Sequence, residues 1–322
     1  CRAKNLDQLL LLILFAMGFL SALLMNDTLA IIGTPLMLYL AQALRISPKL
    51  LLLTLAFAVT TGSAMSPIGN PQNLLIAING SLTNPFLVFF QYLFIPTVAN
   101  LVLAYLILRL FYKSQFQQTA IEIPKECISD PTLANISRIS IIMLLILILA
   151  KVLAVTVQSS QHFSLTYIAI FSALPVILFS SRRWEIMQHI DWCTLVFFAA
   201  MFVLMDSVWR SGFFQSMMQE SSLGFGSIPV ILALSVFLSQ IISNVPFVAL
   251  FQPLLHNPSA QDLMALAAGS TIAGNLFILG AASNVIIIQN AEKSGETLTF
   301  LDFARVGVPL TALNVFVYWI FL

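Results

Sequence analysis

Two short polar sequences interrupt long apolar stretches and carry side chains suited to binding a small ion or solute. The first is Asn26-Asp27-Thr28 and the second is Ser243-Asn244-Val245-Pro246. Amide and hydroxyl groups supply oxygen ligands for a hard cation such as Na⁺ and hydrogen-bond donors for an anion. Asn26 and Asn244 occupy the same place in the two sequences, 218 residues apart, so the pattern predicts one type of site built twice.

A second pair of polar interruptions follows the first pair at similar distances. The stretches 60–73 and 271–284 share Thr, Gly and Asn at equivalent places, with an offset of 211 residues. Gly and Pro at membrane depth predict broken helices, which are tolerated where they line a cavity. Gly lets the backbone approach a ligand, and Pro holds an unwound geometry. The predicted substrate- and ion-binding residues are Asn26, Asp27, Thr28, Thr61, Gly62, Ser63, Gly69, Asn70, Pro71, Asn73, Ser243, Asn244, Pro246, Gly274, Gly280, Ser283 and Asn284.

Asp27 is the feature that the two halves do not share, because Val245 stands at the equivalent place. A carboxylate at the centre of a bilayer costs roughly 3 kcal/mol or more. Neutralisation by H⁺ or Na⁺ removes that cost. Asp27 is therefore the residue predicted to couple the binding of one of these ions to the transport of a solute. A structural alternative is that Asp27 caps the second helix of its hairpin. No organic cofactor and no metal site are predicted, apart from Na⁺ or H⁺ as coupling ion.

Other polar residues favour structural roles. Lys151 is expected to snorkel from a span or line a cavity, and Asp206 to lie near a membrane interface. The remaining metal-ligating types are too widely spaced for a metal site or a disulfide framework: Cys1, Cys127, Cys193, His162, His189 and His256.

Composition places the chain in the membrane. It is 59% hydrophobic and 8% charged, whereas soluble domains carry about 25% charged residues. A net charge of +1 without a dense basic run gives no indication of a nucleic-acid partner.

The apolar segments predict an all-α polytopic membrane protein with two inverted repeats. The first repeat, 1–112, contains a re-entrant hairpin at 6–44, a broken helix at 50–78 and a span at 86–108. A cytoplasmic linker covers 113–138. The second repeat, 139–322, contains spans at 139–157, 165–180 and 192–209, an interfacial segment at 210–227, a hairpin at 228–255, a broken helix at 263–288 and a last span at 300–322.

The distribution of Lys and Arg supports this topology. The loops 79–85, 158–163 and 256–262 contain neither residue, and are predicted to be external. Five crossings separate the two hairpins, so they enter from opposite sides of the membrane, as in transporters with inverted repeats. Three spans precede the second hairpin within its repeat and none precedes the first, which predicts that about three N-terminal helices are missing from this sequence.

At Asn26-Asp27-Thr28, Ile68-Gly69-Asn70-Pro71-Gln72-Asn73 and Ser243-Asn244-Val245-Pro246, the chain resembles the ion transporter superfamily. That superfamily includes arsenite permeases, NhaD-type antiporters and citrate transporters, and the resemblance is closest to the bacterial YbiR-like anion permeases. It covers nearly the whole chain. It implies a homodimeric secondary transporter of the bacterial inner membrane, with hairpin tips and unwound loops forming the site.

The sequence departs from the dicarboxylate branch, whose hairpin tips read Ser-Asn-Thr. Here Asp27 introduces a carboxylate, Val245 removes a hydroxyl, and no Arg lies in either tip. The leading prediction is an ion-coupled transporter of a small anion. Arsenite efflux and sodium/proton exchange remain as alternatives, because a neutral metalloid tolerates Asp27. Two further alternatives belong to other functional classes: an intramembrane aspartyl enzyme that uses Asp27 and Asp206, and a channel. No GxGD-like, HExxH or GxSxG sequence supports the enzyme.

Overall fold

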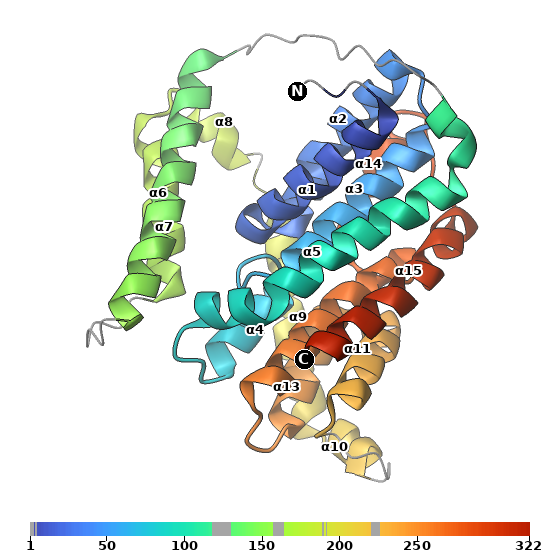
Figure 1. Ribbon diagram of the computed structural model, residues 1–322. Coiled ribbons are helices and arrows are strands. Elements are labelled where there is room, and N and C mark those ends of the chain that lie inside the picture. Colours follow the sequence, from blue (N-terminus) through green and yellow to red (C-terminus); the bar gives the residue numbers. More distant parts are fainter. Residues whose placement is uncertain are drawn as a thin grey trace. The chain divides into compact units, whose positions relative to one another are not determined.

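The computed structural model describes residues 3, 5–117, 130–156, 164–188, 190, 192–219 and 226–322, and every regular element in these ranges is a helix (Figure 1). The chain forms two compact units. Unit 1 comprises residues 1–124 and 202–322, and unit 2 comprises residues 125–201.

Proline and asparagine begin the helices of the first half of unit 1. These helices are α1 (Leu6–Leu24), α2 (Asn26–Leu44), α3 (Pro48–Ser63), α4 (Pro71–Asn79) and α5 (Pro85–Phe111), followed by the short η1 (Lys113–Gln117). The helices α3, α4 and α5 each start with Pro at the first helical position, where its missing N–H has no helical partner to lose. Asn70 and Asn84 cap α4 and α5 through their side-chain oxygens.

The second half of unit 1 begins within α9. Its elements are α9 (Trp192–Arg210), α10 (Phe213–Gln219), α11 (Ile228–Ile242), α12 (Asn244–Phe251), η2 (Gln252–Leu254), α13 (Ala260–Ile272), η3 (Ala273–Asn275), η4 (Ile278–Gly280), α14 (Ala282–Glu292) and α15 (Phe300–Phe321). Capping boxes at Ser259 and Thr299 fix the starts of α13 and α15.

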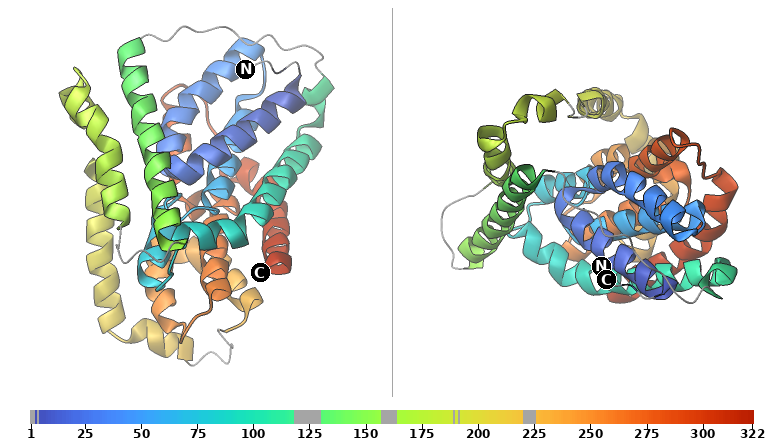
Figure 2. Two further views of the ribbon diagram at one scale, coloured as in Figure 1. Left: turned by 60° about the vertical axis from the view of Figure 1, so that its left-hand side comes forward. Right: turned by 90° about the horizontal axis from the view of Figure 1, so that it is seen from above.

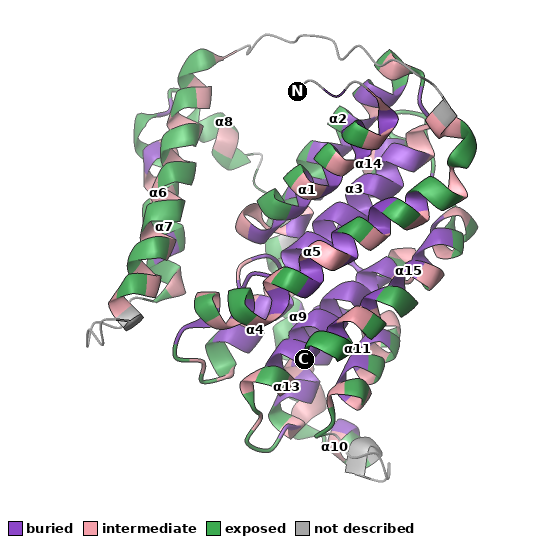
Figure 3. Ribbon diagram, viewed as in Figure 1, coloured by how far each residue is buried: buried purple, intermediate pink, exposed green. Residues whose placement is uncertain are grey.

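Two helices form the centre of unit 1. Every residue of α3 from Leu50 to Ser63 and every residue of α13 from Leu263 to Ile272 is buried (Figure 3). A helix that is buried on all sides must be surrounded by other helices. The contacts agree, because α1, α2 and α5 pack on α3 while α11 and α15 pack on α13. Each central helix ends at one of the predicted breaks.

The predicted hairpins and broken helices coincide with pairs of helices. The chain enters α1 and leaves α2 at the same end of unit 1, so these helices form a hairpin (Figures 1 and 2). The pairs α3–α4 and α13–α14 correspond to the predicted broken helices. That the hairpins are re-entrant and the repeats inverted stays a prediction, as does the division at 112 and 138.

Unit 2 contains α6 (Pro131–Thr156), α7 (Leu165–Phe179), α8 (Arg183–Gln188) and the start of α9, and α6 packs along α7. The helix α6 begins at Pro131 rather than at the predicted position 139, because Asp130 accepts a hydrogen bond from the Leu133 N–H and adds an earlier first turn.

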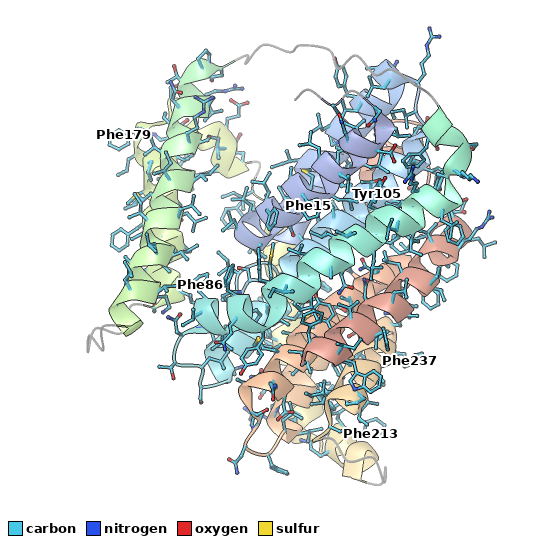
Figure 4. The ribbon with its side chains drawn as sticks, viewed as in Figure 1. Phe15, Phe86, Tyr105, Phe179, Phe213 and Phe237 are labelled. Carbon is cyan, nitrogen blue, oxygen red and sulfur yellow. The ribbon has the colours of Figure 1, made fainter. Side chains whose placement is uncertain are left out.

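The surface and lengths of the helices fit a multi-pass membrane protein. Five helical stretches in the described part of the chain are long and apolar enough to cross a bilayer: α1, α2, α5, residues 131–154 of α6, and α15. Phe179, Phe213 and Phe237 are 67–75% exposed, and all three point away from their own helices (Figure 4). Such side chains suit contact with lipid.

Candidate functional site

The two hairpins have the same break in their backbones. A single residue, Met25, separates α1 from α2, with φ 66° and ψ 144°. A single residue, Ser243, likewise separates α11 from α12, with φ 67° and ψ 161°. This backbone region is close to exclusive to glycine, so both tips hold strained residues. The equivalence inferred from the sequence therefore extends to the local backbone.

Each break places an asparagine at the first position of the next helix. Asn26 and Asn244 are each 6% exposed, and the Oδ1 atom of each has no hydrogen-bond partner among the described residues. A buried carbonyl oxygen without a partner is costly, by about 1–3 kcal/mol. Both tips thus present an acceptor that a ligand can satisfy.

Asn26 also connects its tip to both broken helices. Its backbone N–H donates to the Gly69 carbonyl at 3.0 Å, and its Nδ2 donates to the Ser283 Oγ at 3.4 Å. Two predicted site residues from distant parts of the sequence therefore meet at the first tip.

The side chains of two nearby asparagines hold the first unwound segment, residues 64–70, in its turn. The Asn73 Nδ2 donates to the carbonyls of Ser63, Ala64 and Ser66 at 3.0–3.3 Å. The Asn70 Oδ1 accepts from the Asn73 N–H at 2.8 Å, which caps α4. A Cβ at Gly69 would overlap the Ser63 backbone, so this turn requires glycine.

The second unwound segment, residues 273–281, has fewer internal bonds. The Asn284 Nδ2 donates to the Gly274 carbonyl at 2.6 Å, and the Gln240 Nε2 donates to the Ala273 carbonyl at 2.8 Å. The Oδ1 of Asn284, the Oε1 of Gln240 and the Oγ1 of Thr60 are buried without a partner in the described ranges.

Hydrogen bonds between the two halves hold the breaks against each other. The Asn70 Nδ2 donates to the Thr271 Oγ1 at 3.0 Å, and the Thr271 hydroxyl donates to the Asn73 Oδ1 at 3.3 Å. The Asn275 Nδ2 donates to the Thr61 Oγ1 at 3.0 Å. These bonds join only amides and hydroxyls, so the network that connects the two breaks is electrically neutral.

Asp27 lies in the first turn of α2 and is partly buried, while the neighbouring Thr28 is exposed. The alternative prediction, that Asp27 is the residue that caps α2, was wrong. Met25 occupies the N-cap position and no side chain caps α2. A carboxylate in the first turn still interacts favourably with the positive end of the helix dipole.

The structure places the other predicted residues less centrally. Pro71 is the first residue of α4, and Pro246 is buried within α12. A Cβ at Gly62 would overlap the backbone of Gly18, so this glycine serves the α1–α3 packing. Gly280 lies next to the Gln240 amide, where a Cβ would come within 2.8 Å of its Oε1.

The other residues that the sequence singled out lie away from the two hairpin tips and the two breaks. The Asp206 carboxylate pairs with Arg210 at 2.8 Å, with a side chain that is 57% exposed. His256 is exposed, and no group of three metal-ligating residues occurs in the described ranges. Lys151 lies on α6 of unit 2. Cys1, Cys127, His162, His189 and the side chain of Cys193 lie outside the described residues.

Sequence reasoning missed several buried polar residues that contact this network or lie behind it. They are Thr97, Asn100, Thr271, Asn275, Thr311, Asn314 and Tyr318. One signal was present in the sequence. Thr-x-x-Asn occurs at 97–100 and again at 311–314, an offset of 214 residues that extends the internal repeat to α5 and α15.

Comparisons with known proteins place this architecture among transporters. Residues 2–263 match the family model described as "Citrate transporter" (CitMHS). A "46 kDa membrane protein" of Mycobacterium leprae is 26% identical over 341 residues, which cover 98% of this chain and 76% of that protein. An "uncharacterized transporter" of Mycobacterium tuberculosis is 28% identical, over 96% of this chain and 75% of its own length. The human "P protein" is 24% identical over 97% of this chain, which spans 48% of that longer protein.

Proposed function

The chain belongs to the citrate transporter family within the ion transporter superfamily, and on that premise we propose that it is an ion-coupled secondary transporter of a small anion. The family and the names of the relatives indicate a multi-pass membrane transporter rather than an enzyme. The class of substrate, the use of a coupling ion and the mechanism go beyond the family assignment, and these are what we propose.

One observation carries the proposal. Two hairpin tips with the same strained backbone each bury an asparagine whose Oδ1 has no partner in the described chain. Amide oxygens suit a hard cation such as Na⁺. The adjoining starts of α2 and α14 provide backbone N–H groups and positive dipole ends, which suit an anion. A tip can thus hold an ion and a substrate side by side.

Asp27 is the proposed coupling residue. It is partly buried one position from Asn26, at the tip whose hydrogen bonds reach both broken helices. Binding of Na⁺ or H⁺ neutralises its charge and removes its repulsion of an anionic substrate. Release of the ion restores the repulsion and favours release of the substrate. Alternating access then follows from movement of the hairpin-bearing helices against the rest of the protein.

A second candidate is arsenite efflux, with sodium/proton exchange as a third. They stay open because no basic side chain takes part in the bonds that join the two breaks, so a multiply charged anion would have to be bound by backbone N–H groups and helix dipoles. Arsenite is uncharged near neutral pH, so a protein carboxylate does not repel it. By its family resemblance, the protein is proposed to act as a homodimer in a bacterial inner membrane.

Transport by purified protein in sealed proteoliposomes tests these functions. Radiolabelled citrate, arsenite and ²²Na⁺ are offered in parallel under an imposed Na⁺ gradient, a pH gradient, or neither. We expect citrate to accumulate above equilibrium only under a gradient. Gradient-driven arsenite or Na⁺ movement without citrate uptake would select one of the alternatives. Equilibration of all three solutes under every condition would exclude coupling and favour a channel.

The variant Asp27→Asn tests the coupling residue. We expect gradient-driven uptake to fall about tenfold or more, which corresponds to about 1.4 kcal/mol of lost ion binding, while the melting temperature stays near that of the wild type. Asp206→Asn is the matched control and should transport normally, because Asp206 is an exposed partner of Arg210. Full coupled uptake by Asp27→Asn would remove Asp27 from the mechanism.

A further inference from the structure

The helices α5 and α15 present matching polar faces inside unit 1. Thr97 and Asn100 on α5 correspond to Thr311 and Asn314 on α15, and each pair is spaced three residues apart. This spacing places both members on one side of a helix. All four side chains are at most 2% exposed, although the rest of each helix is mainly apolar.

These faces meet where the two helices pack together. The Thr97 Oγ1 and the Tyr318 hydroxyl lie 2.7 Å apart, which joins α5 to α15. Tyr318 is one turn beyond Asn314 on the same face of α15. Asn100 adjoins the Tyr318 hydroxyl, but neither atom of its amide forms a hydrogen bond of good geometry.

The same cluster touches the second unwound segment. The Asn275 Nδ2 donates to the Asn314 Oδ1 at 3.0 Å and to the Thr61 Oγ1 at 3.0 Å. A Cβ at Gly307 would overlap the Asn275 carbonyl, so α15 lies directly against this segment. The polar faces of α5 and α15 therefore lie behind the candidate site rather than within it.

Five polar atoms of this cluster have no hydrogen-bond partner within the described residues. They are the Oδ1 and Nδ2 of Asn100, the Oγ1 of Thr311, the Nδ2 of Asn314 and the Oδ1 of Asn275. These atoms lie on neighbouring turns of two packed helices and on the segment that contacts them, and leaving them unsatisfied is unfavourable unless a bound molecule provides their hydrogen bonds.

The chemistry of the unpartnered atoms identifies the occupant. A cation would satisfy the Asn oxygens but would face the amide N–H₂ groups, which repel it. An anion would satisfy the N–H₂ groups but would face the oxygens. Water both donates and accepts, and a buried water typically makes about three hydrogen bonds to such groups. No carboxylate occurs among the cluster residues to balance a charge.

We propose that ordered water occupies the crossing of α5 and α15 and joins Asn100 and Thr311 to Asn314 and the unwound segment at Asn275. This water belongs to both repeats, because the Thr-x-x-Asn motif supplies one side of the site from each. The proposal does not depend on which solute is transported or on which ion drives it.

The sign of a stability change tests the proposal. In the variants Asn100→Leu and Thr311→Val, loss of a water ligand should lower the melting temperature of the purified protein by roughly 2–6 °C. If the crossing is dry, the same variants remove unsatisfied polar atoms and should raise it. Thr54→Val is the matched control, because its buried hydroxyl bonds only to the Leu50 carbonyl of its own helix. Its melting temperature should stay within about 1 °C of the wild type. A rise in both test variants would overturn the proposal.

Radiolytic labelling gives a second readout, which also serves if one variant does not fold. Millisecond X-ray exposure generates hydroxyl radicals from bound water, so Tyr318 should be oxidised in the wild type despite being fully buried. Labelling should fall several-fold in Thr311→Val, and absence of Tyr318 labelling in the wild type would contradict bound water.

Replacement of NaCl by choline chloride should leave the difference in melting temperature between wild type and Asn100→Leu unchanged. If the two melting temperatures differ only when Na⁺ is present, a cation rather than water occupies the place where α5 and α15 cross.

Discussion

The two unwound segments occupy equivalent places in the repeats but differ in how their polar groups are satisfied. Thr271 exchanges hydrogen bonds with Asn70 and Asn73. The hydroxyl of its equivalent, Thr60, has no partner in the described chain, and neither does the Oδ1 of Asn284, the equivalent of Asn73. Ala281 stands where the first repeat has Asn70. One missing amide thus leaves the second segment with polar atoms available to a ligand, whereas the first segment is complete.

The packing of the repeats is more alike than their chemistry. The helix α14, from the second repeat, packs on α2 of the first, and α4 of the first repeat packs on α12 of the second. In both cases a helix from one half of unit 1 packs on the hairpin of the other half. Paired substitutions, one in each half, can measure how far the two halves differ.

The largest difference is expected where the hairpins pack on the central helices. A Cβ at Gly62 of α3 would overlap the Gly18 backbone, which no rotamer change can relieve. A Cβ at Gly269 of α13 would come within 2.7 Å of the Ser235 Cβ, so α11 and α13 would have to move apart slightly, but it would overlap no backbone atom as closely as at Gly62. We expect Gly62→Ala to cost more than about 3 kcal/mol and Gly269→Ala about 1 kcal/mol. Thermal unfolding followed by size-exclusion chromatography measures the stability of both variants. Equal losses of stability would show that α1 packs on α3 as tightly as α11 packs on α13.

A smaller difference is expected between the two asparagines that hold the unwound segments. Replacing Asn73 removes three hydrogen bonds to carbonyls, although backbone N–H groups still reach the carbonyls of Ser63 and Ser66, whereas replacing Asn284 removes one. We expect Asn73→Ala to destabilise the protein by about 2–3 kcal/mol and Asn284→Ala by about 1 kcal/mol. The same melting assay compares them. A larger loss for Asn284→Ala would contradict the view that the first segment is the complete one.

The smallest expected effect concerns the feature that the hairpins share. Met25 and Ser243 adopt positive φ values that suit glycine. We expect Met25→Gly and Ser243→Gly each to raise stability by about 1 kcal/mol, because relief of strain exceeds the entropic cost of glycine. Ser172→Gly, in the middle of α7, is the control and should lower stability by about 0.5–1 kcal/mol. A gain at one tip alone would show that the two breaks are not equivalent.

The sequence was informative where local patterns determine the structure. The changes from apolar to polar at Asn26, Gly69, Asn244 and Gly280 located all four helix breaks within a few residues. The partners that site residues find in the other half were not predictable, because they lie 198 to 257 residues away. No local pattern specifies which distant hydroxyl an amide meets. Capping by Asp27 was wrong because the N-cap position lies two residues earlier, at Met25. Its role in coupling stays a prediction.

The exchange of helices between repeats has a consequence for biosynthesis. Asn26 and its partner Ser283 are 257 residues apart, so the ribosome adds all of the intervening chain before this contact can form. Until α14 emerges, α2 must wait in the membrane without the helix that packs on it. Contacts this distant form slowly, so we expect the first hairpin to be completed late in folding.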